Sequence, residues 1–357
     1  MNSKERVMSA LNGAQPDRRP YTPCIDNYTR SGLPEPYRSM DIINVQKAFG
    51  ADMVRGPWCY KEQYDSTIRI EEKRVNGSII TRYLTPVGTL QKTETFTKES
   101  PNIPFPAEHL IKTAEDLETF NYLTEHTSCV PDYKELEDAL KKNSNIVVAT
   151  GIMSTAFEDM LAHHSGVEKF VYLYYDHTAL IEETMAILKQ KREREAAITA
   201  QGPAEVIICY ENTNTANSSP EWIKQFEIPM LNDYARIMHD HGKKLLVHMC
   251  GHINMVVDQI AAALFDGIVD VAPPPTGDCD LPAAVRTLGA QGKVLTGGIE
   301  CTMFAHLKPD ALVSEVRSLV SSIPDTRCFF LGSGDAVPQG TSVENLNAIK
   351  ALIEKPF

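Results

Sequence analysis

The stretch Leu245-Leu246-Val247-His248-Met249-Cys250-Gly251-His252 decides the fold. An apolar run that ends in polar residues and glycine is typical of a buried parallel strand that stops at a functional loop. His248 and Cys250 are two residues apart, so in an extended chain their side chains point to the same face. A histidine and a cysteine at one strand end suit zinc, but a hydrogen-bonded core histidine beside an inert cysteine gives the same pattern.

Seven further segments read as strands, and helical patterns separate them along the chain. They lie near residues 21, 51, 146, 206, 268, 294 and 328. Alternating strands and helices form parallel sheets through right-handed crossovers, so eight such units predict an α/β fold, the (β/α)8 or TIM barrel. An open doubly wound sheet is the alternative, but no GxGxxG sequence supports a dinucleotide site. We expect a single domain over residues 1–357.

Residues from about 66 to 96 break this alternation. Asn76-Gly77 lies between two apolar, strand-like segments and is a strong signal for a two-residue hairpin turn. The sequence therefore predicts an antiparallel β-hairpin insertion after the second strand. Further along, the charged run Lys189–Glu195 predicts a solvated helix face.

Composition limits the classes of partner. The 357 residues carry a formal net charge of -12, and an acidic protein lacks the clustered cations that bind nucleic-acid phosphates. No apolar stretch is long enough to cross a membrane, and the first residues lack the apolar core of a signal peptide. The eight cysteines are scattered without a CxxC pair, which favours a reducing cytoplasm over a disulfide framework.

Residues that follow the expected strands meet at one end of a barrel, where active sites of this fold lie. They include Asp26, Asn27, Glu211, His248, Cys250, Glu300, Cys301 and Ser333. Glu211 follows the strand next to that of His248 and Cys250, so these three predict a zinc site with open positions. Glu227 lies on the segment between them, where it either joins the site or is a surface carboxylate.

Several motifs resemble the uroporphyrinogen decarboxylase superfamily. They lie at the N-terminus, in the middle and at the end of the chain: Lys4-Glu5-Arg6-Val7, Asp17-Arg18-Arg19-Pro20, Ser219-Pro220-Glu221, His248-Met249-Cys250-Gly251, Gly297-Gly298-Ile299, Gly332-Ser333-Gly334 and Ser342-Val343-Glu344-Asn345. The resemblance spans nearly the whole chain and implies a (β/α)8 barrel.

The branches of this superfamily differ in their motifs. The decarboxylases carry Arg-Gln-Ala-Gly-Arg after the first strand, where this chain has Asn27–Gly32. His248-x-Cys250 is similar to the zinc motif of the cobamide methyltransferases that methylate coenzyme M. Their third ligand is a cysteine where this chain has Ser333, so Glu300 or Cys301 would have to replace it.

A third branch, the methyltransferases that begin O-demethylation of aryl methyl ethers, is similar in carrying a Glu, Glu, His zinc pattern. Glu211, Glu227 and His248 match that order. The resemblance implies His248 and Glu227 as zinc ligands, completed by Glu211 or Cys250. An oxygen-rich site is a harder Lewis acid, which suits an ether oxygen. Asp26, Tyr210 and Glu300 are then expected to line the pocket or supply a proton.

The resemblance implies a zinc-dependent methyltransferase that moves a methyl group from a methylated aromatic substrate to the cob(I)alamin of a separate corrinoid protein. This chain has no corrinoid-binding Asp-x-His-x-x-Gly motif of its own. A homodimer is compatible with this expectation. Three alternatives remain: a methylcobamide:thiol methyltransferase, a metal-free porphyrinogen decarboxylase and a non-catalytic tetrapyrrole-binding protein.

Overall fold

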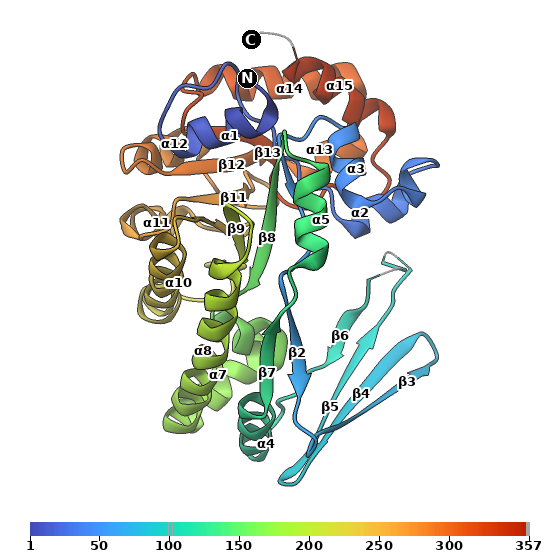
Figure 1. The fold of residues 1–357 in the computed structure, drawn as a ribbon, viewed down its shortest axis with the longest axis vertical. Helices are drawn as coiled ribbons and strands as arrows, with labels where there is room; N and C mark the ends of the chain where they lie inside the picture. The colour runs from blue at the N-terminus through green and yellow to red at the C-terminus, as the bar shows by residue number, and fades with distance from the viewer. Residues whose placement is uncertain (99, 102, 355–357) are drawn as a thin grey trace. The chain divides into compact units, whose positions relative to one another are not determined.

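The structure is a computed structural model that describes residues 1–98, 100–101 and 103–354 (Figure 1). The chain divides into two compact units. The first contains Met1–Cys59, Tyr133–Ile152 and the chain from Ala200 onwards, and the second contains Tyr60–Asp132 and Met153–Thr199. That the whole chain acts as one domain stays a prediction.

A parallel sheet forms the centre of the first unit and confirms the predicted barrel class. Within the described residues it has seven strands, in the order of the following list. They are β1 (Met53–Arg55), β8 (Val147–Met153), β9 (Val206–Tyr210), β10 (Lys244–His248), β11 (Gly267–Val271), β12 (Val294–Ile299) and β13 (Phe329–Ser333). Each of them lies at a position predicted from an apolar run.

The expected strand near residue 21 is reduced to a single parallel bridge between Tyr21 and Leu331 of β13. The carbonyl of Tyr21 accepts a hydrogen bond of 2.7 Å from the backbone N–H of Asp52, just before β1. This short segment therefore occupies the eighth position, between the two edge strands. It stays short because Pro20 and Pro23 flank Tyr21 and cannot donate ladder hydrogen bonds.

Helices surround this sheet, and α12 and α14 pack against β12 (Figure 1). The helices of the first unit are α1 (Ser3–Leu11), α2 (Asn27–Gly32), η1 (Tyr37–Ser39), α3 (Ile42–Ala48), α5 (Lys134–Lys142), α9 (Pro220–Trp222), η3 (Ile223–Glu227), α10 (Ile228–Asp240), η4 (Asn254–Val256), α11 (Val257–Ala262), α12 (Leu281–Gly289), α13 (Cys301–His306), α14 (Pro309–Ser322) and α15 (Val343–Ile353).

Alternate residues of the strands fill the barrel interior, because every second side chain points inward. Val206 and Ile208 of β9 and Leu246 of β10 belong to this core, together with Val7 and Leu11 of α1. Continuing the alternation brings Tyr210 and His248 to the same inner face at the C-terminal ends of their strands. The barrel core therefore aims His248 into the mouth of the barrel.

The second unit contains the predicted insertion. Its strands are β2 (Tyr60–Tyr64), β3 (Arg69–Val75), β4 (Ser78–Thr85), β5 (Gly88–Thr95), β6 (Phe105–Glu108) and β7 (Thr127–Pro131). Its helices are α4 (Ala114–Glu125), α6 (Ala156–Glu158), η2 (Asp159–His164), α7 (Val167–Asp176) and α8 (Thr178–Gln201).

The predicted hairpin is confirmed, with Val75 paired to Ser78 across Asn76-Gly77. Both turn residues have positive φ, 50° and 78°, as this turn requires. The insertion is larger than predicted, since β3, β4, β5 and β6 form one antiparallel sheet (Figure 1). β6 tolerates Pro106 because it is an edge strand.

The predicted solvated face at Lys189–Glu195 is wrong for three of its residues, whereas Gln190 and Arg194 are exposed as predicted. Lys191, Arg192 and Glu195 are buried in the second unit. Arg192 donates to Glu195 at 2.7 Å and to Asp159 at 2.6 Å. Charged side chains can be buried when they are paired in this way, and Asp159, one of the two partners of Arg192, lies outside the run. No helix in the described part of the chain is both long and apolar enough to cross a lipid bilayer.

Candidate metal centre

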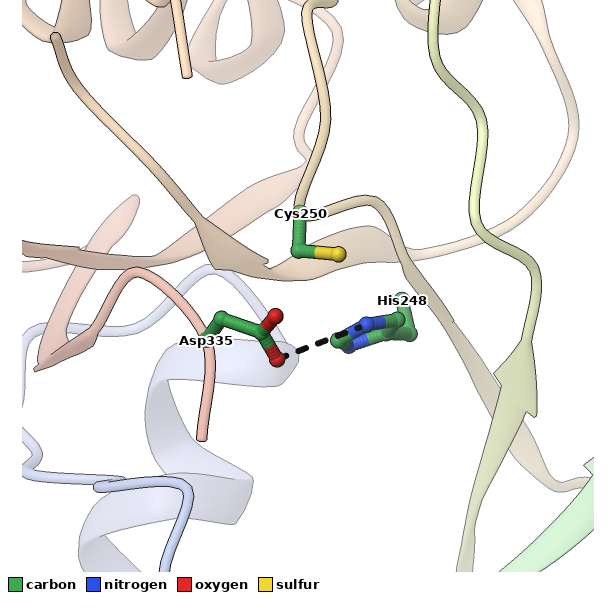
Figure 2. A group of neighbouring side chains, drawn as sticks. All are labelled: His248, Cys250 and Asp335. Carbon is green, nitrogen blue, oxygen red and sulfur yellow. Dashed lines mark ion pairs between the residues drawn. The ribbon is translucent and has the colours of Figure 1, made fainter. Parts of the chain in front are cut away.

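His248, Cys250 and Asp335 point toward one another at the C-terminal end of the barrel (Figure 2). One ligand atom from each of the three lies within 4.8 Å of those of the other two. His248 ends β10, Cys250 lies in the loop that follows, and Asp335 lies in the loop after β13. His248 Nε2 is 3.9 Å from Asp335 Oδ1. His248 is buried, whereas the Asp335 side chain is 52% exposed, so the group opens to solvent on one side.

The other ring nitrogen of His248 is held by Asp270. Nδ1 lies 2.7 Å from Asp270 Oδ2, and the buried carboxylate also forms an ion pair with Arg55. A carboxylate that accepts from Nδ1–H leaves Nε2 as the ligand atom and fixes the orientation of the ring. Asp270 is therefore placed to orient His248 toward the cluster.

The backbone at Asp270 departs from regular strand geometry. The register of β11 and β12 shifts between Ile268 and Val271, and Asp270 has φ +63°. Val269 belongs to the inner core, so regular alternation would point Asp270 away from the barrel interior. Bulges of this kind redirect a side chain, and here the carboxylate reaches His248. Gly297 makes room for the bulge, since a Cβ there would lie 2.5 Å from the backbone nitrogen of Val271.

The electrostatics of this group suit a cation. Burial lowers the pKa of His248, but hydrogen bonds to Asp270 and Cys250 outweigh it and raise the pKa to about 10. Burial raises the pKa of Asp270, but Arg55 and His248 outweigh it, so this pKa is lowered. Without a metal, His248 thus keeps a proton beside the carboxylate of Asp270. A metal ion that binds Nε2 takes the place of that proton.

An aromatic wall stands beside the cluster. The ring of Tyr210 lies 6.3 Å from that of His248 and stacks on Trp58 at 5.8 Å with an interplanar angle of 17°. Gly151 allows this packing, because a Cβ there would lie 2.6 Å from Tyr210. Trp58 remains 37% exposed. The wall offers a flat apolar surface close to the candidate metal position.

Glu211 and Glu227 form a separate pair of carboxylates. Both are fully buried, and one oxygen of each lies within 4.8 Å of the other. Glu227 Oε2 accepts a hydrogen bond of 2.7 Å from Thr213, whereas Oε1 has no partner among the described residues. Burial raises the pKa of Glu227 to about 7. Glu227 is thus not a surface carboxylate, and the structure groups it with Glu211 rather than with His248 and Cys250.

The position of Glu227 follows from the local sequence. It ends η3, a π-helical turn, and Pro229 stands in the first turn of α10. Proline has no N–H to donate and disturbs regular helical bonding, which favours such a turn.

Two other predicted site residues cap helices. Asp26 accepts a hydrogen bond of 2.8 Å from the backbone N–H of Thr29 at the start of α2. Glu300 accepts a hydrogen bond of 3.1 Å from the backbone N–H of Thr302 at the start of α13. Ser333 stands in the position of the cysteine ligand of one related branch. Its hydroxyl accepts a hydrogen bond of 2.9 Å from the backbone N–H of Cys24. Catalytic roles for Asp26 and Glu300 stay predictions.

Sequence reasoning missed Asp335 and Asp270. Asp335 lies only two residues after Ser333, in the loop where a related branch has its third ligand, and a carboxylate at that place is a sequence signal for a ligand. Asp270 interrupts the buried run Gly267–Val271, and an acidic residue inside a buried strand is itself a signal. The resulting group offers nitrogen, sulfur and oxygen ligands, a set that suits zinc with an open position.

Comparison with known proteins places this barrel in a family. The sequence model described as uroporphyrinogen decarboxylase (URO-D) matches residues 94–355, most of the chain. The chain therefore belongs to the uroporphyrinogen decarboxylase family. No curated protein sequence matches it.

Solved structures agree with the fold. A methyltransferase from Methanosarcina mazei is similar with a TM-score of 0.65 and 16% identity, over 99% of this chain and 98% of that one. At this identity the likeness shows the fold alone. An intracellular xylanase from Thermoanaerobacterium saccharolyticum has a TM-score of 0.37 and 10% identity, over 62% of this chain and 81% of that one. So low a score has no bearing on function.

Proposed function

We propose that this protein is a zinc-dependent methyltransferase whose metal is bound by His248, Cys250 and Asp335. The convergence of these three ligand atoms at the barrel mouth carries the proposal. The fold shared with the Methanosarcina mazei methyltransferase agrees with it. Glu211 and Glu227, the other ligands expected from the sequence, have no part in this metal site.

The residues fit a catalytic rather than a structural zinc. Three protein ligands, one from a strand end and two from loops, leave a fourth position for substrate, and the exposed side of Asp335 gives it access from solvent. When bound, zinc acts as a Lewis acid that polarises the heteroatom carrying the methyl group. Asp270 holds the His248 ring so that Nε2 points to the metal position.

The expected donor is an aryl methyl ether, with the cob(I)alamin of a separate corrinoid protein as methyl acceptor. Support for the aromatic part comes from the wall of Trp58 and Tyr210, because aromatic rings stack favourably in offset geometry. The wall orients the ring of the substrate and leaves its ether oxygen near His248. The corrinoid belongs to a partner in this proposal, since the chain carries no corrinoid-binding motif of its own.

A second candidate is methylation of a thiol from a methylated corrinoid. Cys250 favours it, because its sulfur lies within the cluster beside His248. A thiolate ligand raises electron density at zinc and suits a metal-bound thiol as the nucleophile. The carboxylate of Asp335 makes the bound zinc a harder Lewis acid, which favours an ether oxygen over a thiol. The aryl methyl ether therefore remains the leading methyl donor.

A coupled assay tests the proposal. Protein loaded with zinc is mixed with reduced cobalamin and an aryl methyl ether, and the spectrum of methylcobalamin is followed. We expect Cys250→Ser and Asp335→Asn to lose methyl transfer at least 100-fold, whereas Glu221→Gln, on the exposed start of α9, retains it. Equal activity of zinc-free and zinc-loaded protein would overturn the proposal.

The thiol candidate is separated in the same experiment by replacing the components. Methylcobalamin and a small thiol are then supplied, and loss of the methylcobalamin spectrum is followed. Turnover of this pair without turnover of the ether identifies the second candidate as the activity.

A further inference from the structure

A cavity of about 580 Å³ lies at the opposite end of the barrel from His248. Arg19, in its wall, precedes the Tyr21 bridge by two residues, and Thr326 precedes β13 by three. These residues lie before their strands, whereas His248 ends its strand. Three arginines contribute to the wall, Arg18, Arg19 and Arg317, and Ser321 and Thr326 add hydroxyl groups. The cavity is thus rich in hydrogen-bond donors, and its three arginines outnumber Asp17, a carboxylate in the same wall.

Arg19 is the unusual member of this wall. It is 4% exposed, and its guanidinium makes one hydrogen bond, of 2.5 Å, to the carbonyl of Ile323. Its Nε and Nη1 atoms are buried without a partner among the described residues. The guanidinium also stands over the ring of Phe329 at 4.9 Å. Burial lowers the pKa of Arg19 to about 10, although Asp325 opposes the shift. A buried cation without a carboxylate partner destabilises a protein unless an anion joins it.

The nearby acids are committed to other cations. Asp17 accepts a hydrogen bond of 2.7 Å from Arg6, and Asp52 accepts hydrogen bonds from both Arg6 and Arg18. Asp325 accepts 2.8 Å from Arg327. Arg317, on the exposed side of α14, has no ion pair among the described residues. Arg19 and Arg317 therefore leave positive charge at the cavity that forms no ion pair with a described carboxylate.

We propose that this cavity binds a small oxyanion, a phosphate or carboxylate group, between Arg19 and Arg317. Guanidinium groups match the geometry of both kinds of oxyanion. The hydroxyls of Ser321 and Thr326 supply further donors. Because the cavity lies at the end of the barrel away from His248, the anion stabilises the fold and takes no part in the chemistry there.

Thermal unfolding and calorimetry test this site with inorganic phosphate as the probe. Phosphate is compared with chloride at equal ionic strength, with zinc-loaded and zinc-free protein. We expect saturable phosphate binding to wild type and a rise in Tm of several degrees, because a ligand that binds only the folded state stabilises it. The rise is expected with and without zinc. Wild type without saturable binding overturns the proposal.

Two variants locate the site. Arg317→Glu reverses an exposed charge and is expected to fold and to weaken phosphate binding at least tenfold. Arg236→Glu, an equally drastic change on the exposed face of α10, retains binding. Arg19→Met is expected to lose the Tm rise while unfolding no earlier than wild type in chloride. If Arg19→Met does not fold, the phosphate affinity of Arg317→Glu tests the proposal alone. A wild-type phosphate affinity in Arg317→Glu overturns the proposal. Benzoate, titrated in parallel, tells a carboxylate ligand from a phosphate one.

Discussion

His248 Nδ1 lies 2.7 Å from Asp270 Oδ2, and this contact joins the candidate metal site to the partly buried cation of Arg55. Asp270 reaches His248 only because its backbone adopts φ +63° at a shift in strand register. A residue other than glycine with such a positive φ is uncommon, and residues of this kind cluster at functional sites. The contact therefore explains both the local backbone and the orientation of the histidine.

Asp270→Asn is expected to weaken zinc binding by about 10- to 100-fold, because the amide no longer accepts a charged hydrogen bond from the imidazole. Competition with a chromogenic chelator measures the affinity. Asp266→Asn is the matched control, since Asp266 contacts the surface histidine His239 at 2.9 Å. Zinc affinity of Asp270→Asn within twofold of wild type would contradict the positioning role.

Tyr210→Ala is expected to raise KM for an aryl methyl ether by about fivefold, because the substrate loses a stacking partner worth roughly 1 kcal/mol. Tyr210→Phe preserves the ring and separates it from the hydroxyl. Unchanged kinetics of the Phe variant assign the role to the ring, whereas a fall in its kcat assigns a proton to the hydroxyl. A Tyr210→Ala enzyme with unaltered KM would remove the support for an aromatic substrate.

Glu227→Gln is expected to stabilise zinc-free protein above pH 7. The pKa of Glu227 is raised to about 7 from 4.5, so the folded state holds a proton that the unfolded chain loses between those values. Stability from this group is complete below pH 4.5 and falls as the pH rises to 7, by a total of the order of 3 kcal/mol. Glutamine does not titrate and avoids this loss.

Urea unfolding at pH 5 and pH 8 measures the difference between wild type and Glu227→Gln. The variant should gain on wild type at the higher pH, while Glu221→Gln follows wild type at both. A gain that is the same at both pH values would mean that Glu227 is ionised in the folded protein throughout.

Arg192→Met is expected to destabilise the second unit by about 3–5 kcal/mol, because it leaves Glu195 and Asp159 buried with one cation fewer. Arg194→Met is the control, since Arg194 is exposed in the same run. Chemical denaturation followed by circular dichroism measures both. Equal stability of the two variants would show that the buried network contributes nothing to folding.

The sequence predicted the barrel well because parallel strands are buried on both faces and appear as apolar runs. The segment at Tyr21 was harder, since prolines reduce it to one bridge. The burial of charged side chains was predicted wrongly where an ion-pair partner is distant in sequence. Arg192 is buried because it pairs with Asp159, 33 residues away. No local pattern encodes that contact.

The site was predicted in part for a similar reason. His248 and Cys250 were found because a strand end and a two-residue spacing place them together. Asp335 comes from a loop without periodicity, and only the folded barrel brings it to His248. Glu227 matched an expected order of ligands, but the structure groups it with Glu211 instead.

The most direct test of the proposed metal centre is X-ray absorption at the zinc edge of the purified, substrate-free protein. The account predicts stoichiometric zinc with one sulfur neighbour at about 2.3 Å and the remaining neighbours nitrogen or oxygen. The sulfur signal should vanish in Cys250→Ser and persist in Glu227→Gln. Zinc with nitrogen and oxygen neighbours alone in wild type, lost on Glu227→Gln, would contradict a centre formed by His248, Cys250 and Asp335.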